Sequence, residues 1–253
     1  MATITVRRPQ FDFPSDLPAV PSPDDPQGSC ETVGLSFTLP FRAFSGQEAQ
    51  HCKNHALVND IVRNQLSDPA AAEMRALEDG LEADYRRFTA EKSLAFNLAY
   101  AEGFEAMTFS LARTGMTARD TGVDRDAKWT EPMGWHLAEE IEHRTVTFDV
   151  QEHVHGKYPH RLAVGTWARL HYLGCLLSMA TVVYRDQIDP DISSWRVKWQ
   201  AIQRGWRNGS LQGTLAAMSP RCNPRKVTLS GHPTTYARHR LVRNRPRLTL
   251  QWE

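Results

Sequence analysis

Two short stretches of the chain contain Glu-x-x-His, one at Glu48 and His51 and the other at Glu140 and His143. On an α-helix, an offset of three residues puts the carboxylate and the imidazole on the same face, one turn apart. Two such helices that face each other would bring two carboxylates and two imidazoles together. With single Glu residues from further helices, this is the ligand pattern of dinuclear iron or manganese centres inside helical bundles. The sequence therefore predicts paired helices around a metal site.

The second motif is part of a longer cluster, WHLAEEIEH, at residues 135–143. His136 and Glu139 lie close to Glu140 and His143 on the helix surface, and apolar residues between and beyond them predict a largely buried helix. A buried carboxylate is costly unless a partner or a metal neutralises it. We therefore predict that Glu140 and His143 bind metal. For Glu139 and His136 two roles stay open, as ligands or as residues that orient the ligands.

A further carboxylate is expected from a nearly all-apolar helix predicted at residues 91–113. Glu102 is the preferred ligand there, although a salt-bridged core carboxylate is the alternative role, and Glu105 is a nearby competitor. On the first motif helix, His55 lies one further turn beyond His51. The predicted ligands are Glu48, His51, Glu102, Glu140 and His143, with His55 and His136 as possible substitutes or orienting residues.

Helical periodicity dominates the chain, and no strand alternation of useful length precedes the C-terminal tail, which predicts an all-α fold. Dense prolines predict an extended N-terminal arm at residues 1–40, followed by a helical metal-binding domain at 41–218. The basic segment 219–253 is expected to be a solvated, flexible tail. The predicted helices span approximately residues 45–66, 70–88, 91–113, 132–153, 162–184 and 193–217.

Composition excludes several classes of function. The formal net charge is only +1, so the chain as a whole has no electrostatic footprint for nucleic acid or an anionic membrane. The four cysteines form no Cys-x-x-Cys pair, which argues against a zinc ribbon and a disulfide framework. No Gly-x-Ser-x-Gly elbow, phosphate loop or dinucleotide fingerprint is present. A small-molecule substrate is therefore the expected partner.

The expected location is the cytoplasm. The N-terminus lacks the apolar core and cleavage site of a signal peptide, and the scattered cysteines suit a reducing compartment. The most apolar segment, residues 162–184, contains Arg169 and His171 near its middle, which is costly in a bilayer. We expect a buried helix there and no integral membrane span.

Four segments resemble a known bacterial family, the predicted metal-dependent hydrolases: VRRPQFDFP, FSGQEAQHCKNH, AYAEGFEA and above all WHLAEEIEHRTVTFDV. The resemblance covers roughly residues 4–185. The same motifs look equally like ferritin-like, carboxylate-bridged diiron proteins. The resemblance implies a ferritin-like bundle and ligands from three helices, which are Glu48 with His51, then Glu102, and finally Glu140 with His143.

The chain departs from the family at one point. A helix with an acidic start normally lies between the segments that match LSFTLP and FRAFSGQEAQH, but here Pro40 runs directly into Phe41. One helix and its carboxylate are therefore expected to be absent. Three interpretations are possible. The chain binds metal poorly, or the missing ligand is replaced by Glu139, His136 or His55. Alternatively, a partner chain such as a second copy covers the open face.

Two enzymatic hypotheses and one non-catalytic hypothesis follow. A hydrolase would use a metal-activated water on an ester, amide or phosphoester, with Glu139 or Glu142 as general base. A diiron oxygenase would activate O₂ and oxidise a small organic substrate. Mixed imidazole and carboxylate ligands suit iron or manganese, with zinc as the alternative. The third hypothesis is a helical metal-binding or interaction protein with a broken site.

Overall fold

The computed structural model describes residues 38–119 and 127–227. Within these ranges, side chains are described except near some helix ends, at 38–47, 116–119, 127–133 and 142. The described residues form helices and no β-strand, which confirms the predicted all-α class. The helices are α1 (Thr38–Asn64), α2 (Asp68–Glu91), α3 (Leu94–Arg119), α4 (Ala127–His143), α5 (Val146–Val154), α6 (Tyr158–Gln187), α7 (Ser194–Arg207), α8 (Ser210–Ala217) and the 3-10 helix η1 (Pro224–Lys226).

The N-terminal boundary of the bundle differs slightly from the expectation. Helix α1 begins at Thr38, so the last residues of the predicted arm are helical. Pro40 fits because it lies in the first turn, where a missing backbone N–H has no intrahelical partner to lose. Residues 1–37 of the predicted arm and residues 228–253 of the predicted tail lie outside the described residues.

Two predicted helices are each divided in the structure. The helix expected at 132–153 is interrupted after His143, where the β-branched Thr145, Val146 and Thr147 lower helix propensity. The helix expected at 193–217 turns at Gly209, whose φ of +84° is easily adopted only by glycine. The Asn208 side chain accepts a hydrogen bond from the Ser210 backbone N–H, 3.0 Å away, and so starts α8.

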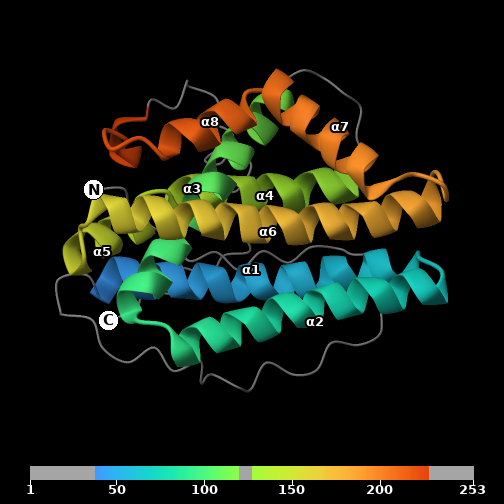
Figure 1. Ribbon diagram of the computed structural model, residues 1–253, viewed down its shortest axis with the longest axis horizontal. Coiled ribbons are helices and arrows are strands. Elements are labelled where there is room, and N and C mark those ends of the chain that lie inside the picture. The colour runs from blue at the N-terminus through green and yellow to red at the C-terminus, as the bar shows by residue number, and fades with distance from the viewer. Residues whose placement is uncertain (1–37, 120–126, 228–253) are drawn as a thin grey trace.

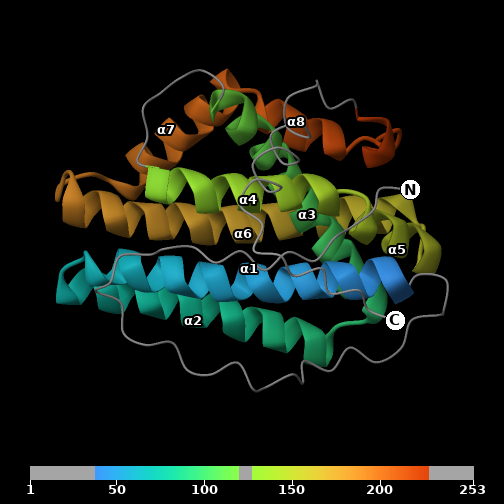
Figure 2. The same cartoon turned by 180° about the vertical axis from the view of Figure 1, so that it is seen from behind.

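The helices form layers around an oblique central helix (Figures 1 and 2). Helices α1 and α2 are antiparallel neighbours on one side, α7 and α8 lie on the opposite side, and α4 and α6 run between them. Helix α3 crosses these layers and contacts α2, α4, α5, α6 and α8. Its faces therefore decide which side chains meet in the interior.

Helices α3 and α6 approach unusually closely. A Cβ atom added to Gly103 would lie 2.4 Å from the Gly165 Cα, so the two backbones touch at this point. One turn away, the aromatic Phe88 and Tyr100 pack with Ala168 in a buried cluster. The glycine pair thus fixes the spacing and rotation of α3 against α6.

Helix α6 contains residues 162–184, the most apolar segment of the sequence. No helix among the described residues is both long and apolar enough to cross a membrane. Instead, Arg169 is buried against α3, and His171 Nε2 lies 3.0 Å from Asp84 Oδ2 of α2. Cys52, Cys175 and Cys222 are free thiols.

We predict that Gly103→Ala destabilises the fold, because the added methyl group meets the α6 backbone rather than a flexible side chain. The expected loss is about 1–3 kcal/mol of unfolding free energy. Gly174→Ala on α6 is the matched control, since nothing lies within 4 Å of its Cβ position. The control should gain about 0.5–1 kcal/mol from helix propensity. Urea denaturation followed by circular dichroism measures both, and equal stabilities would contradict the close approach.

Candidate metal centre

The two Glu-x-x-His motifs face each other, as their spacing requires. Helix α1 carries Glu48 and His51, and α4 carries Glu140 and His143. His143 Nδ1 lies 2.9 Å from Glu48 Oε1, so the acid of one motif contacts the imidazole of the other. The motifs thus form one cluster rather than two separate surface pairs.

His51 lies at the centre of this cluster. Its Nε2 atom is 2.9 Å from Glu139 Oε2, and its Nδ1 atom is 3.4 Å from Glu48 Oε1 and 3.5 Å from Glu140 Oε1. The His136 ring packs against the His51 ring at a centroid distance of 4.7 Å. One ring nitrogen therefore faces Glu139, and the other faces Glu48 and Glu140.

Three overlapping groups of side chains have the geometry to hold a metal ion. In each group, one ligand atom per residue lies within 4.8 Å of the others. Each two of the groups have one residue in common, which is His51, Glu140 or His143, so the potential metal positions are adjacent. The groups are Glu48 with His51 and His143, His51 with His136 and Glu140, and Glu105 with Glu140 and His143.

The cluster is buried on most sides and opens on one. The side chains of His51, Glu140 and His143 are almost completely buried. By contrast, the Glu48 side chain is 36% exposed and the His136 side chain is 23% exposed. Solvent or a small ligand can therefore approach beside Glu48 and His136.

Glu48 and His51 behave as an ion pair in the metal-free protein. Burial raises the pKa of Glu48, but hydrogen bonds from His143 and His51 outweigh it and lower this pKa to about 2. Burial lowers the pKa of His51, but its contacts with Glu139 and Glu48 raise this pKa to about 10. At neutral pH His51 is therefore a cation that balances one carboxylate charge.

Glu105 lacks such compensation, and for Glu140 the compensation is incomplete. Burial, followed by the neighbouring Glu140 and Glu48 carboxylates, raises the pKa of Glu105 well above its usual range. Burial also raises the pKa of Glu140, and a hydrogen bond from Thr108 offsets only part of this. Burial therefore disfavours the ionised form of both carboxyl groups. A divalent cation would supply the missing positive charge.

Unpartnered polar atoms also fit a metal. The Oε2 atoms of Glu105 and Glu140 and the Nδ1 atom of His136 are buried without a hydrogen-bond partner among the described residues. Such atoms are rare in native interiors because leaving them unpaired is costly. Burial, then the nearby His51 and His55, lowers the pKa of His136 to about 3, so its ring is neutral and able to donate electrons to a metal. The donor set present here therefore suits a metal ion.

The structure places Glu102, the preferred carboxylate on the apolar helix, in a different environment. Its Oε1 atom lies 3.3 Å from Arg161 Nη1 of α6, and Arg169 is the second nearby cation. Glu105, the competitor, is the α3 residue that joins a candidate metal group. The salt-bridged core role considered for Glu102 thus matches its surroundings. The sequence signal for this pairing is the presence of Arg161 and Arg169 in the mostly apolar α6, because buried cations need an acidic partner.

The other predicted site residues differ in where they lie relative to the cluster. His136 joins one metal group, whereas His55 is exposed, with its ring 4.8 Å from that of His136, and belongs to none of the three groups. Glu139 is fully buried against His51. The side chain of Glu142 lies outside the described residues.

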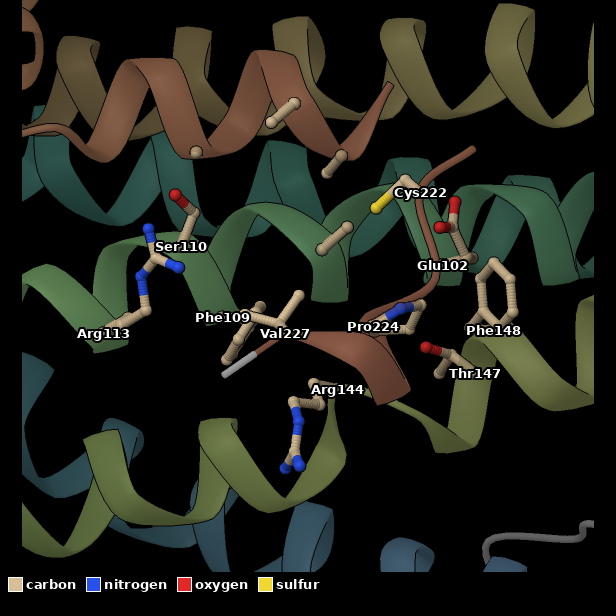
Figure 3. Close-up of a pocket in the computed structure, with 14 residues that line it drawn as sticks. Glu102, Phe109, Ser110, Arg113, Arg144, Thr147, Phe148, Cys222, Pro224 and Val227 are labelled. Atoms are coloured by element: carbon tan, nitrogen blue, oxygen red, sulfur yellow. The ribbon is translucent and has the colours of Figure 1, made fainter. Parts of the chain in front are cut away.

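A separate pocket lies between α3, α5 and the segment after α8 (Figure 3). Its volume is about 100 Å³, and none of the residues in the three metal groups lines it. Glu102 lies toward one end of this pocket, and Ser110 and Arg113 lie toward the other (Figure 3).

Comparison with known proteins identifies one family. Residues 36–228 match the family model described as "Predicted metal-dependent hydrolase". This match includes both Glu-x-x-His motifs and all the described helices. No curated protein and no solved structure gives a significant match to the chain.

We predict that Glu105→Gln lowers metal affinity strongly, because Glu105 contributes a buried oxygen to the cluster. The loss should exceed the roughly 10–100-fold that changes beside a ligand cause. Glu102→Gln is the matched variant three residues away. It should leave metal affinity unchanged and cost about 3–5 kcal/mol of stability, since Arg161 and Arg169 lose a buried counter-ion. Calorimetric metal titration and thermal unfolding separate these effects, and the reverse pattern would make Glu102 the ligand.

We also predict that metal binding releases protons and strengthens with pH. His51, with a pKa of about 10, holds a proton at neutral pH that a metal must displace, and the raised pKa of Glu105 makes its ionised form harder to reach. As the pH rises fewer protons compete, so apparent affinity should increase about tenfold per pH unit for each proton released. Titration with manganese(II) in two buffers of different ionisation enthalpy counts the protons. An affinity independent of pH between about pH 6 and pH 9 would contradict these charge states.

Proposed function

Because the chain belongs to the predicted metal-dependent hydrolase family, we propose that it is a hydrolase whose Glu/His cluster binds two divalent metal ions. The observation that carries this proposal is the overlap of the candidate metal groups at His51, Glu140 and His143. Adjacent positions with shared ligands are the arrangement that a dinuclear site needs. The buried carboxyl groups of Glu105 and Glu140 support it, since burial raises the pKa of both and bound cations would balance their charge.

The proposed ligands come from three helices. Helix α1 provides Glu48 and His51, α3 provides Glu105, and α4 provides Glu140 and His143. We further propose that His136 takes the place of the carboxylate expected from the absent helix, because it shares a group with His51 and Glu140. Imidazole and carboxylate donors favour iron or manganese, with zinc as the alternative. The ferritin-like character of the bundle is part of the same proposal.

Bound metal would supply a Lewis acid and a water molecule of lowered pKa, which suits hydrolysis of an ester, amide or phosphoester. The chain's own residues prepare the site. Glu139 holds His51 through Nε2, which leaves His51 Nδ1 directed toward Glu48 and Glu140. This is the second-sphere carboxylate arrangement that orients a metal-binding imidazole. We therefore propose an orienting role for Glu139, with general base as the competing role.

A small substrate would reach the cluster beside the two most exposed donors, Glu48 and His136. The neutral His136 ring lies at this opening, and the exposed His55 ring packs against it. These two histidines would thus contact a substrate before the buried donors do. A second copy of the chain that covers the open bundle face remains a prediction.

An O₂-activating diiron oxygenase is the second candidate function. Glu105 and Glu140, which are both buried and share a group with His143, favour it because carboxylate-rich sites stabilise iron. Both candidates use the same residues, so the metal and the reaction must be measured together.

The deciding experiment loads the purified protein with iron(II) under anaerobic conditions, and separately with manganese(II) or zinc(II). Elemental analysis should find about two metal ions per chain, as expected of a dinuclear site. p-Nitrophenyl acetate, p-nitrophenyl phosphate and bis(p-nitrophenyl) phosphate then test hydrolysis, and an oxygen electrode tests O₂ consumption. Hydrolysis supports the first candidate, and O₂ uptake only in the iron form supports the second. Absence of specific metal binding would overturn both and favour a non-catalytic helical protein.

We predict that Glu140→Gln abolishes metal loading and activity, whereas Glu139→Gln retains both in part. The amide of Glu139→Gln can still accept a hydrogen bond from His51, so its metal affinity should fall less than that of Glu139→Ala, which should lose roughly 10–100-fold. Exposed Glu91→Gln is the control for a lost surface carboxylate. A Glu139→Gln protein with full metal content and no hydrolysis would instead identify Glu139 as the general base.

A further inference from the structure

Helix α7 carries a continuous apolar stripe that the metal centre does not use. Trp195, Trp199, Ile202 and Trp206 follow one another at offsets of four, three and four, so they share one face of the helix. Their exposed fractions are 69%, 47%, 39% and 57%. Three exposed tryptophans on one helix face are uncommon on a protein surface, where large aromatic side chains are normally covered.

The stripe is not the face that α7 uses for packing. The small or buried residues Val197, Ala201 and Gly205 form another face, and α7 contacts α6 and α8. Figure 1 shows α7 at the outer edge of the bundle, on the side opposite α1 and α2. The rings of Trp195 and Trp199 stack on each other, 6.0 Å apart. The tryptophan stripe is thus a surface feature, distinct from the core.

Positive charge flanks the stripe. Helix α7 contains Arg196, Lys198, Arg204 and Arg207 and no acidic residue. None of these four cations has an ion-pair partner among the residues that the structure describes. Around the helix, Arg196 and Arg207 fall on one side of the stripe and Lys198 on the other, at the 100° rotation per residue of an α-helix. The polar flanks therefore attract anions while the stripe between them repels water.

The acid-free region is larger than α7. From Ile192 to Trp252 the sequence has twelve basic residues and no acidic one. The net charge of +1 for the whole chain therefore conceals a strong separation, with nearly all acids before Ile192. The exclusion of an anionic surface as a partner, drawn from the total charge, does not apply to residues 192–252.

We propose that α7 docks the protein on the surface of an anionic phospholipid membrane, lying flat in the headgroup region with its tryptophan stripe inserted. Tryptophan is the side chain most suited to this interface, because its ring is apolar and its N–H can reach water or a headgroup. Basic residues on the flanks add attraction to anionic lipids. This docking is peripheral, which agrees with the absence of a spanning helix among the described residues. It is independent of the proposed hydrolase activity.

Two other occupants fit the stripe less well. A second copy docking through the same face would bring two sets of basic flanks together without acids to pair them. Single-stranded nucleic acid would stack on the tryptophans, but Ile202 interrupts them and gives bases nothing to stack on. In a bilayer, by contrast, all four side chains of the stripe would insert into the interface.

The test is sedimentation of the full-length protein with vesicles. One set contains three parts phosphatidylcholine to one part phosphatidylglycerol, and the other contains phosphatidylcholine alone. Binding to the anionic vesicles should be strong at about 0.1 M salt and weaker at about 0.5 M, because salt screens the flanking cations. Tryptophan fluorescence should shift to shorter wavelength as the rings leave water.

Two double variants and their matched controls assign the binding to α7. Trp199→Ser with Trp206→Ser should lower vesicle affinity about tenfold or more, since both rings leave the interface. Arg196→Gln with Arg207→Gln should weaken binding to anionic vesicles about tenfold and reduce its salt dependence. The controls are Leu170→Ser with Ile188→Ser, exposed apolar residues outside the stripe, and Arg86→Gln with Arg87→Gln on α2. All variant sites are exposed, so circular dichroism should show unchanged folding.

Several outcomes would overturn the proposal. Absence of vesicle binding by the unmodified protein would do so without any variant. Equal loss in the controls and the α7 variants would place the binding elsewhere. A dimer that the Trp199→Ser and Trp206→Ser pair converts to monomer would assign the stripe to a second copy, and tighter binding to an oligonucleotide than to vesicles would assign it to nucleic acid. If acrylamide quenches the tryptophan fluorescence of this double variant as strongly as that of the unmodified protein, another segment covers the stripe.

Discussion

The structure depends on how it neutralises carboxylates buried among α1, α3 and α4. Glu48 is ionised and held by His51 and His143, whereas Glu105 and Glu140 have few positive neighbours and raised pKa values. Burying several acids together is unfavourable unless protons or cations balance them. Without a metal, the protonated His51 balances one carboxylate charge, and burial disfavours the ionised form of Glu105. A metal ion would replace the proton on His51, which links metal binding to the packing of α1 against α4.

Helix α3 separates this cluster from a second buried charge network. Glu105 faces the cluster, while Glu102, one turn earlier, faces Arg161 and Arg169 of α6. The close approach of Gly103 and Gly165 sets the rotation of α3 and thereby decides which acid goes to which side. A small change in that rotation would exchange a structural ion pair for a ligand. The backbone contact between two glycines is therefore part of the site's architecture.

The two proposals concern opposite parts of the molecule. The cluster involves α1, which lies in the layer opposite α7 and α8 (Figure 1). The four basic residues of α7, which has no acidic residue, place positive charge on that side of the molecule. Such segregation lets the cluster keep a negative environment for a cation while α7 meets an anionic surface. Neither property is visible in the total charge.

The sequence by itself determined the all-α class, the pairing of the two Glu-x-x-His motifs and the identity of most cluster residues, because helical spacing alone places Glu48 with His51 and Glu140 with His143 on single faces. It left the choice between Glu102 and Glu105 open, since both lie on neighbouring faces of one apolar helix and only the contact with α6 distinguishes them. Likewise, the spacing of Trp195, Trp199, Ile202 and Trp206 predicts a helix, but whether that stripe is core or surface depends on what packs beside it. Local periodicity assigns side chains to a face of a helix. Only the tertiary arrangement decides what each face meets, because rotation about a helix axis is set by contacts between segments far apart in the chain.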